Sequence, residues 1–126
     1  MENNMQKLSV RSLLMESKVS DNLSSQLERL QELSGSLKEL SKNCNTLNRL
    51  TEDTSVQNLN KENIQECSRL FVEARKNLAA AKKSTDMNDI YEHTKLAYNC
   101  MNDIEDIKET IECSMHDALD AMENAQ

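Results

Sequence analysis

A leucine heptad repeat between Leu23 and Leu50 constrains the fold of this chain more than any other feature. When a and d positions are counted from Leu23, seven of the eight sites are apolar and the 3–4 spacing is uninterrupted. This spacing is typical of a helix that packs a narrow apolar seam against other helices. The a sites are Leu23, Leu30, Leu37 and Cys44, and the d sites are Gln26, Leu33, Leu40 and Leu47.

The residues that flank this seam favour a bundle of three or four helices over a two-stranded coiled coil. Coiled-coil dimers usually carry Glu, Lys or Arg at the e and g positions, where these charges select the partner. In this chain the e positions hold Leu27, Ser34, Ser41 and Asn48. The g positions hold Arg29, Ser36, Asn43 and Leu50, so most of the flanking residues are uncharged. These small flanks would let a second or third helix approach the seam from the side; the alternative is that they merely reflect a serine-rich composition.

The composition makes an all-α fold the expected class. The 126 residues include no proline, one glycine, no tryptophan, two tyrosines and one phenylalanine, so turn-forming and β-favouring residues are scarce. The hydrophobic fraction is 37%, which predicts a thin core of the kind that partner helices often complete. We therefore expect an elongated all-α helical hairpin or three-helix coiled-coil bundle that partner helices complete.

The pattern divides the chain into three helices with two breaks. The polar run after Leu50 predicts a connection, since Thr, Asp, Ser and Asn side chains compete for backbone hydrogen bonds. Asn58 or Asn60 is then a suitable N-cap for the next helix. The expected segments are an N-terminal arm or short amphipathic helix at 1–18, the leucine heptad helix at 19–50, a connection at 51–59, a second helix at 60–84 and a long acidic third helix at 85–124.

The two later helices also carry apolar seams. The second seam consists of Ile64, Cys67, Phe71, Ala74, Leu78 and Ala81. The third consists of Met87, Ile90, Thr94, Ala97, Met101, Ile104, Lys108, Ile111, Met115, Ala118 and Met122.

Charge is distributed unevenly along the chain. Residues 1–83 hold 13 Lys and Arg against 11 Asp and Glu, whereas residues 84–126 hold 2 against 11, which together give the net charge of −7. An acidic third helix argues against nucleic acid or anionic lipid as its partner. The acidic residues of the third helix are expected either to dock to a basic surface of another protein or to form a solvated face that keeps the elongated molecule in solution. The basic residues of the second helix, such as Arg69 and Arg75, are candidates to pair with the third helix inside the molecule.

No catalytic, cofactor or metal constellation emerges from the sequence. One glycine excludes a glycine-rich phosphate loop, and no Ser or Cys has an arguable base and orienting group. Glu112, Cys113 and His116 have helical spacing, but without a CxxC or HExxH context this spacing is weak evidence for a metal site. We expect a protein that is not an enzyme and that binds neither cofactor nor small-molecule substrate.

The expected environment is a reducing compartment. The first residues lack the basic-then-apolar order of a signal peptide, and no run is long and apolar enough to span a membrane. The four cysteines, Cys44, Cys67, Cys100 and Cys113, are widely spaced, which favours free thiols. We expect a cytoplasmic protein, with the nucleus as the alternative.

The leading functional hypothesis is a subunit that co-assembles with other helical proteins in a multi-subunit complex, as scaffold or adaptor. In general character the chain looks like the short coiled-coil subunits of lysosome-positioning, tethering or kinetochore complexes, although it carries no family motif. One alternative is a stand-alone acidic adaptor or chaperone for basic proteins. Another is a homo-oligomeric coiled-coil scaffold, which Thr51 and Thr54 disfavour because they interrupt the heptad seam. The predicted partner interface consists of Leu23, Leu30, Leu33, Leu37, Leu40, Cys44, Leu47, Phe71, Leu78, Met101, Ile104, Ile111 and Met115.

Overall fold

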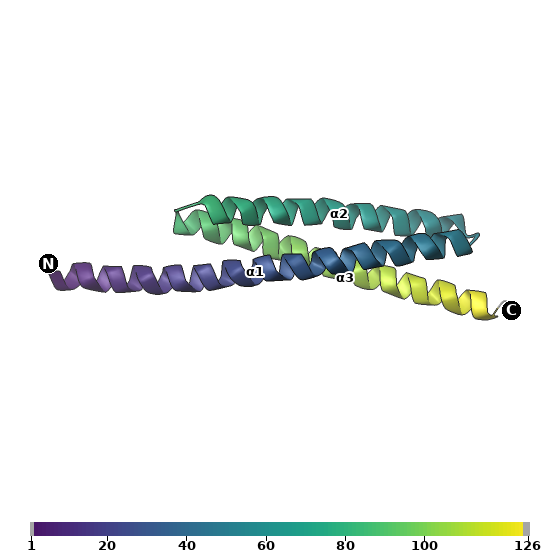
Figure 1. Ribbon diagram of the computed structural model, residues 1–126, viewed down its shortest axis with the longest axis horizontal. Helices are drawn as coiled ribbons and strands as arrows, with labels where there is room; N and C mark the ends of the chain where they lie inside the picture. The colour runs from purple at the N-terminus through teal and green to yellow at the C-terminus, as the bar shows by residue number, and fades with distance from the viewer. Residues whose placement is uncertain (1, 125–126) are drawn as a thin grey trace.

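The chain folds into three α-helices joined by two short turns (Figure 1). The computed structural model describes the backbone of residues 2–124 and the side chains of residues 17–124. α1 spans Glu2–Leu50, α2 spans Thr54–Lys83 and α3 spans Met87–Asn124. No strand occurs between residues 2 and 124, so the predicted all-α helical bundle is confirmed.

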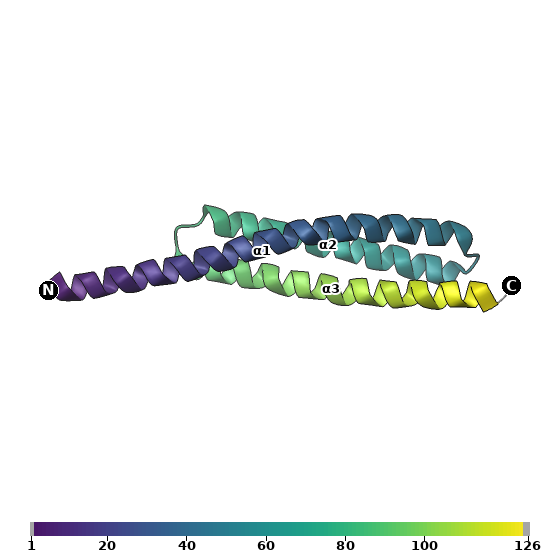
Figure 2. The same ribbon diagram turned by 60° about the horizontal axis from the view of Figure 1, so that its bottom comes forward.

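The helices run up, down and up to give an elongated molecule (Figures 1 and 2). α2 and α3 form an antiparallel hairpin with extensive mutual packing, and α1 contacts each of them less extensively. α1 has 49 residues and α2 has 30. The difference corresponds to about 28 Å of helix at 1.5 Å per residue. The N-terminal part of α1 extends beyond the turn that joins α2 and α3 (Figure 1).

One apolar cluster drawn from all three helices forms the core. The side chains of Leu78, Met101, Ile104 and Ile111 are 0% exposed. Around them α1 contributes its leucines at 3–4 spacing, as a heptad seam predicts. The other buried members are Leu30, Leu33, Leu40, Cys44, Cys67, Leu70, Ala74 and Ala97.

The first turn is shorter than the sequence predicts. Asp53 caps α2, because its Oδ1 accepts hydrogen bonds from the backbone N–H groups of Ser55 at 2.9 Å and Val56 at 3.4 Å. The connection therefore covers residues 51–53, and the predicted boundaries of 51–59 and 60–84 are wrong at this end. Asn58 and Asn60, the two alternatives expected for the cap, both lie inside α2, and Asn60 is fully buried.

Gln57, in the polar run after Asp53, links the start of α2 to the end of α1. Gln57 Nε2 donates to the carbonyl oxygens of Asn48 at 2.9 Å and Thr51 at 2.8 Å. These carbonyls belong to the last turn of α1 and its exit, where helices leave acceptors without partners. Gln57, which lies in the segment expected to be a connection, therefore joins the end of α1 to the first turn of α2.

The second turn consists of residues 84–86, which separate α2 from α3. Asp86 Oδ1 accepts a hydrogen bond from the Asn88 N–H at 3.0 Å. At its N-terminal end, α1 is continuous from Glu2, so the backbone of residues 2–18 belongs to α1 and forms no separate arm. The predicted amphipathic packing of that segment falls largely on residues 1–16, whose side chains lie outside the described part.

Candidate partner interface

Most of the predicted interface residues belong to the chain's own core. Nine of the thirteen are buried, each less than 9% exposed. The seam of α1 therefore meets α2 and α3 of the same chain, so these nine are not accessible to a partner in this fold. The nine are Leu30, Leu33, Leu40, Cys44, Leu47, Leu78, Met101, Ile104 and Ile111.

The other four predicted residues are half-buried and lie at the edges of the core. They are Leu23, Leu37, Phe71 and Met115. Leu37 and Phe71 lie in one groove between α1 and α2. Met115 lines a different groove, between α1 and α3. The structure thus brings together two of the four residues that remain accessible to a partner.

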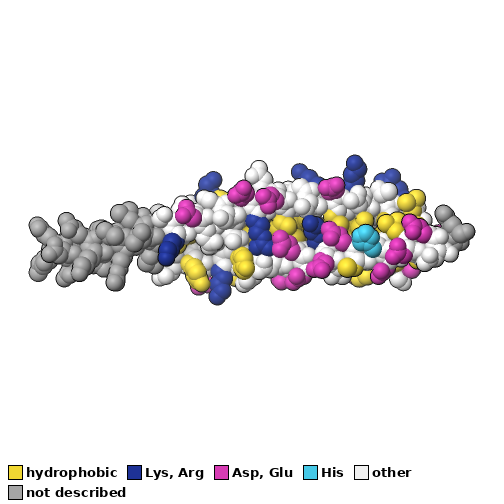
Figure 3. Space-filling view, turned by 90° about the horizontal axis from the view of Figure 1, so that it is seen from below, with side chains coloured by type: hydrophobic (Ala, Val, Ile, Leu, Met, Phe, Trp, Pro, Cys, Tyr) yellow, Lys and Arg dark blue, Asp and Glu magenta, His cyan; other side chains and the backbone are white. Residues whose placement is uncertain are grey.

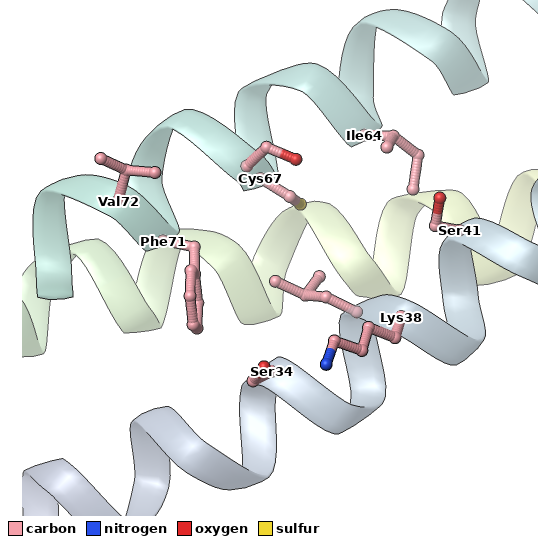
Figure 4. Close-up of a pocket in the computed structure, with 9 residues that line it drawn as sticks. Ser34, Lys38, Ser41, Ile64, Cys67, Phe71 and Val72 are labelled. Carbon is pink, nitrogen blue, oxygen red and sulfur yellow. The ribbon is translucent and has the colours of Figure 1, made fainter.

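The α1–α2 groove is a hollow with four apolar side chains in its lining, Leu37, Ile64, Phe71 and Val72 (Figure 4). It encloses about 420 Å³. The Phe71 ring points from α2 toward α1, and the Lys38 side chain runs along α1 toward Ser34 (Figure 4). The groove is lined by Ser34, Leu37, Lys38 and Ser41 of α1 and by Ile64, Cys67, Ser68, Phe71 and Val72 of α2.

Small side chains keep this groove open. Ser34 and Ser41 occupy e positions of the heptad, where the sequence predicts room for another helix, and Ser68 lies across from them on α2. Side chains of this size do not reach across the gap between two helix backbones. Apolar surface on Leu37 and Phe71 consequently stays in contact with solvent.

Val72 is a groove residue that the sequence reasoning missed. It is 37% exposed and stands one position beyond Phe71, outside the 3–4 seam of α2. A β-branched apolar residue next to a seam residue was the available signal, because it widens the apolar face of an amphipathic helix.

The groove continues toward the α1–α2 turn as a more polar pocket. This second pocket shares Ile64 with the first and adds Cys44, Asn45, Asn48, Asn60, Lys61 and Gln65. Across the two pockets the charged lining residues are Lys38 and Lys61, with no Asp or Glu among them. One of the hollows between α1 and α3 differs, since Glu39 and Glu112 line it together with Lys108.

Arg29 joins α1 to α3 through hydrogen bonds and an ion pair. Its Nη2 donates to Asn102 Oδ1 at 2.9 Å and to Glu105 Oε2 at 2.7 Å. Its guanidinium carbon also lies 5.5 Å from the centroid of the Tyr98 ring, within cation–π range. Among the described side chains, 17–124, this is the one ion pair that joins two helices. The expected pairing of α2 with α3 is not seen there, because Arg69 pairs with Glu66 of its own helix.

The cysteines are free thiols, and three of them are shielded. Burial, with smaller contributions from Glu66 and Cys44, raises the pKa of Cys67 to about 11. Burial also raises the pKa of Cys44, whose Sγ lies 3.7 Å from Met115 Sδ, and that of Cys100. Thiols with raised pKa values stay protonated at neutral pH and are poor nucleophiles.

The residues weighed as metal ligands do not converge. Cys113 and His116 are exposed on α3. Glu112 Oε1 lies 3.9 Å from Lys108 Nζ and forms an ion pair with it. Among the side chains that the structure describes, no group of three or more His, Cys, Asp or Glu is arranged to hold a metal ion.

These observations define a three-helix bundle with an unfilled apolar groove between α1 and α2. Comparison with family models, curated proteins and solved structures yields no match to this chain. Within residues 2–124, none of the helices has both the length and the apolar character that crossing a membrane requires.

Proposed function

We propose that this chain is a non-enzymatic helical subunit that co-assembles with other helical proteins in a multi-subunit complex, as a scaffold or adaptor. A helix of a partner docks in the α1–α2 groove and completes a four-helix arrangement. Three of the helices come from this chain and the fourth from the partner.

The observation that carries the proposal is the apolar lining of the groove. Leu37, Ile64, Phe71 and Val72 present apolar side chains between two helices, with serines where larger residues would close the gap. Amphipathic helices bind in grooves of this kind through side chains at i, i+3 or i+4, and i+7. Aromatic residues such as Phe71 are enriched at the centre of protein interfaces.

The thiols favour a reducing compartment as the place of action. All four cysteines are free, and Cys113 is exposed. Exposed free thiols persist where glutathione and thioredoxin keep them reduced. We place the protein in the cytoplasm or the nucleus.

The test is recovery of partners with a variant that alters only the rim of the groove. Ser68→Glu together with Val72→Glu places two carboxylates on exposed positions of α2 and leaves the core untouched. We expect the wild-type chain to retain helical partner proteins from its native cells, and this variant to recover them at least about ten-fold less, since burying an unpaired charge at an interface is costly.

The matched control is Leu96→Glu together with Asn99→Glu on α3, which adds the same charge at exposed positions away from the groove. It should recover partners as the wild type does. Circular dichroism of all three proteins checks that helicity is equal. Equal partner recovery by the groove variant and the wild type would contradict the proposal.

A stand-alone acidic adaptor or chaperone for basic proteins is the second candidate. α3 carries ten Asp and Glu against two Lys. Figure 3 shows acidic side chains spread along one face of the molecule. This function would place the partner on α3, so the control variant on α3 would change recovery and the groove variant would not.

A further inference from the structure

We infer that the occupant of the α1–α2 groove is an amphipathic helix of a partner protein whose apolar face is flanked by acidic side chains. The inference rests on the proposed function and specifies the chemistry of the partner. Three features of the groove lead to it: its length, the charge of its rim, and the change from apolar to polar lining along its axis.

The length of the groove fits about three turns of helix. Along α2, its lining residues extend from Asn60 to Val72. Twelve residue steps at 1.5 Å amount to about 18 Å, or a little over three turns. A docked helix of this length presents three or four anchoring side chains on one face.

The rim of the groove carries positive charge on both walls. Lys38 stands on α1 and Lys61 on α2, and both side chains are exposed. Neither of them takes part in an ion pair among the described side chains. Carboxylates on the two flanks of a docked helix would meet these ammonium groups, whereas lysines there would be repelled.

The polar end of the groove distinguishes the two ends of the docked helix. Asn60 is 0% exposed, and its Oδ1 accepts no hydrogen bond from the described residues. It lines the pocket beside Asn48 and Gln65. A buried acceptor without a donor costs stability, so a donating side chain of the partner is favoured at this end. Apolar anchors are favoured at the other end, beside Phe71.

The experiment is a selection from displayed helical peptides followed by affinity measurement. The peptides carry Leu at i, i+3, i+7 and i+10, and the flanking positions are randomised among Glu, Gln and Lys. We expect selection on the wild-type chain to enrich Glu at the flanks. Fluorescence anisotropy should then give a Kd about ten-fold lower for the selected peptide than for the same peptide with Lys at its flanks.

Charge reversal on the protein supplies the decisive comparison. Lys38→Glu together with Lys61→Glu should reverse the preference from Glu peptides to Lys peptides. Lys83→Glu together with Lys95→Glu changes the net charge equally but lies outside the groove, so it should keep the preference for Glu.

The outcomes separate this inference from the proposed function. One result is that selected peptides lose binding to the Ser68→Glu, Val72→Glu variant and yet bind the wild-type chain equally well with Glu or Lys at their flanks. This result would overturn the inference about acidic flanks and leave docking in the groove intact. Failure to obtain any peptide sensitive to that double variant would overturn both. If the wild-type chain forms a dimer and the same variant abolishes it, the occupant of the groove is a second copy of this chain. That result would overturn the inference that a different protein binds there.

Discussion

Asn60 and Asn48 show how single polar residues align α1 with α2. Asn60 is fully buried, and its Nδ2 lies 3.4 Å from Asn48 Oδ1. A buried asparagine between helices fixes their register, because sliding one helix leaves its polar atoms without partners. With Gln57 bound to the end of α1, this layer holds Leu37 of α1 in the same groove as Phe71 of α2.

Cys67 provides a prediction about alkaline stability. Its pKa rises from 9.0 to about 11 on folding, mainly through burial. The folded state therefore holds this proton more tightly than the unfolded state, so the associated stability is complete below about pH 9 and is lost as pH rises toward 11. We expect the free energy of unfolding to fall by on the order of 2 kcal/mol from this thiol over that range.

Urea unfolding followed by circular dichroism at pH 8, 9, 10 and 11 measures this loss. Cys67→Ala lowers stability at every pH but should flatten the decline between pH 9 and 11. Cys113→Ala, at an exposed position, should keep the decline of the wild type. An equally steep decline in Cys67→Ala would show that other groups cause it.

At the scale of the helices, the sequence predicts seams better than boundaries. The 3–4 spacing identifies Leu30, Leu33, Leu40 and Leu47 as buried, because this periodicity places them on one face of α1. It does not specify the neighbouring helix, since apolar side chains pack against any complementary apolar face. In the structure Leu30, Leu33 and Leu40 pack in the core with α2 and α3 of the same chain. Co-assembly with partner helices stays a prediction.

The start of α2 illustrates why boundaries are harder. The run from Thr51 to Asn60 resembles a loop, because its Thr, Asp, Ser and Asn side chains compete locally for backbone hydrogen bonds. In the folded chain Gln57 and Asn60 bond to α1 instead, which offsets that competition. Asp53 was the available signal, as an aspartate N-cap before Thr54 and Ser55.

Asp53 also gives a prediction for α2. Replacing it with Ala removes the acceptor for the Ser55 and Val56 N–H groups. We expect Asp53→Ala to lower the free energy of unfolding by about 1 kcal/mol, and Asp53→Asn to restore most of it, because Asn caps nearly as well. Urea titration at pH 7 measures both, and Glu52→Ala serves as the neighbouring control. Equal stability of Asp53→Ala and the wild type would exclude the cap as a stabilising feature.

At the scale of the whole molecule, charge and packing are both asymmetric. α2 carries six Lys and Arg against three Glu, whereas α3 carries two Lys against ten Asp and Glu. α1 lies against this hairpin, held to α3 through Arg29 and separated from part of α2 by the groove. A partner with an acidic helix is thus attracted to the α1–α2 side and repelled from α3.

The groove itself could be predicted only in part. The serines at e positions indicate that another helix has room beside the seam, and Leu37 and Phe71 are both on the predicted interface. Their meeting in one groove depends on the register that Asn48 and Asn60 set and on how α1 crosses the hairpin. Those features arise from contacts between distant parts of the chain, which helical periodicity does not encode.

Hydrogen–deuterium exchange of the purified chain, alone and in complex with its recovered partner, tests the central claim most directly. We expect the partner to slow exchange in residues 34–41 of α1 and 64–72 of α2, with α3 unchanged between residues 87 and 100. Slower exchange centred on α3, or a chain that exchanges fully when alone and becomes protected throughout by the partner, would contradict a preformed groove as the docking site.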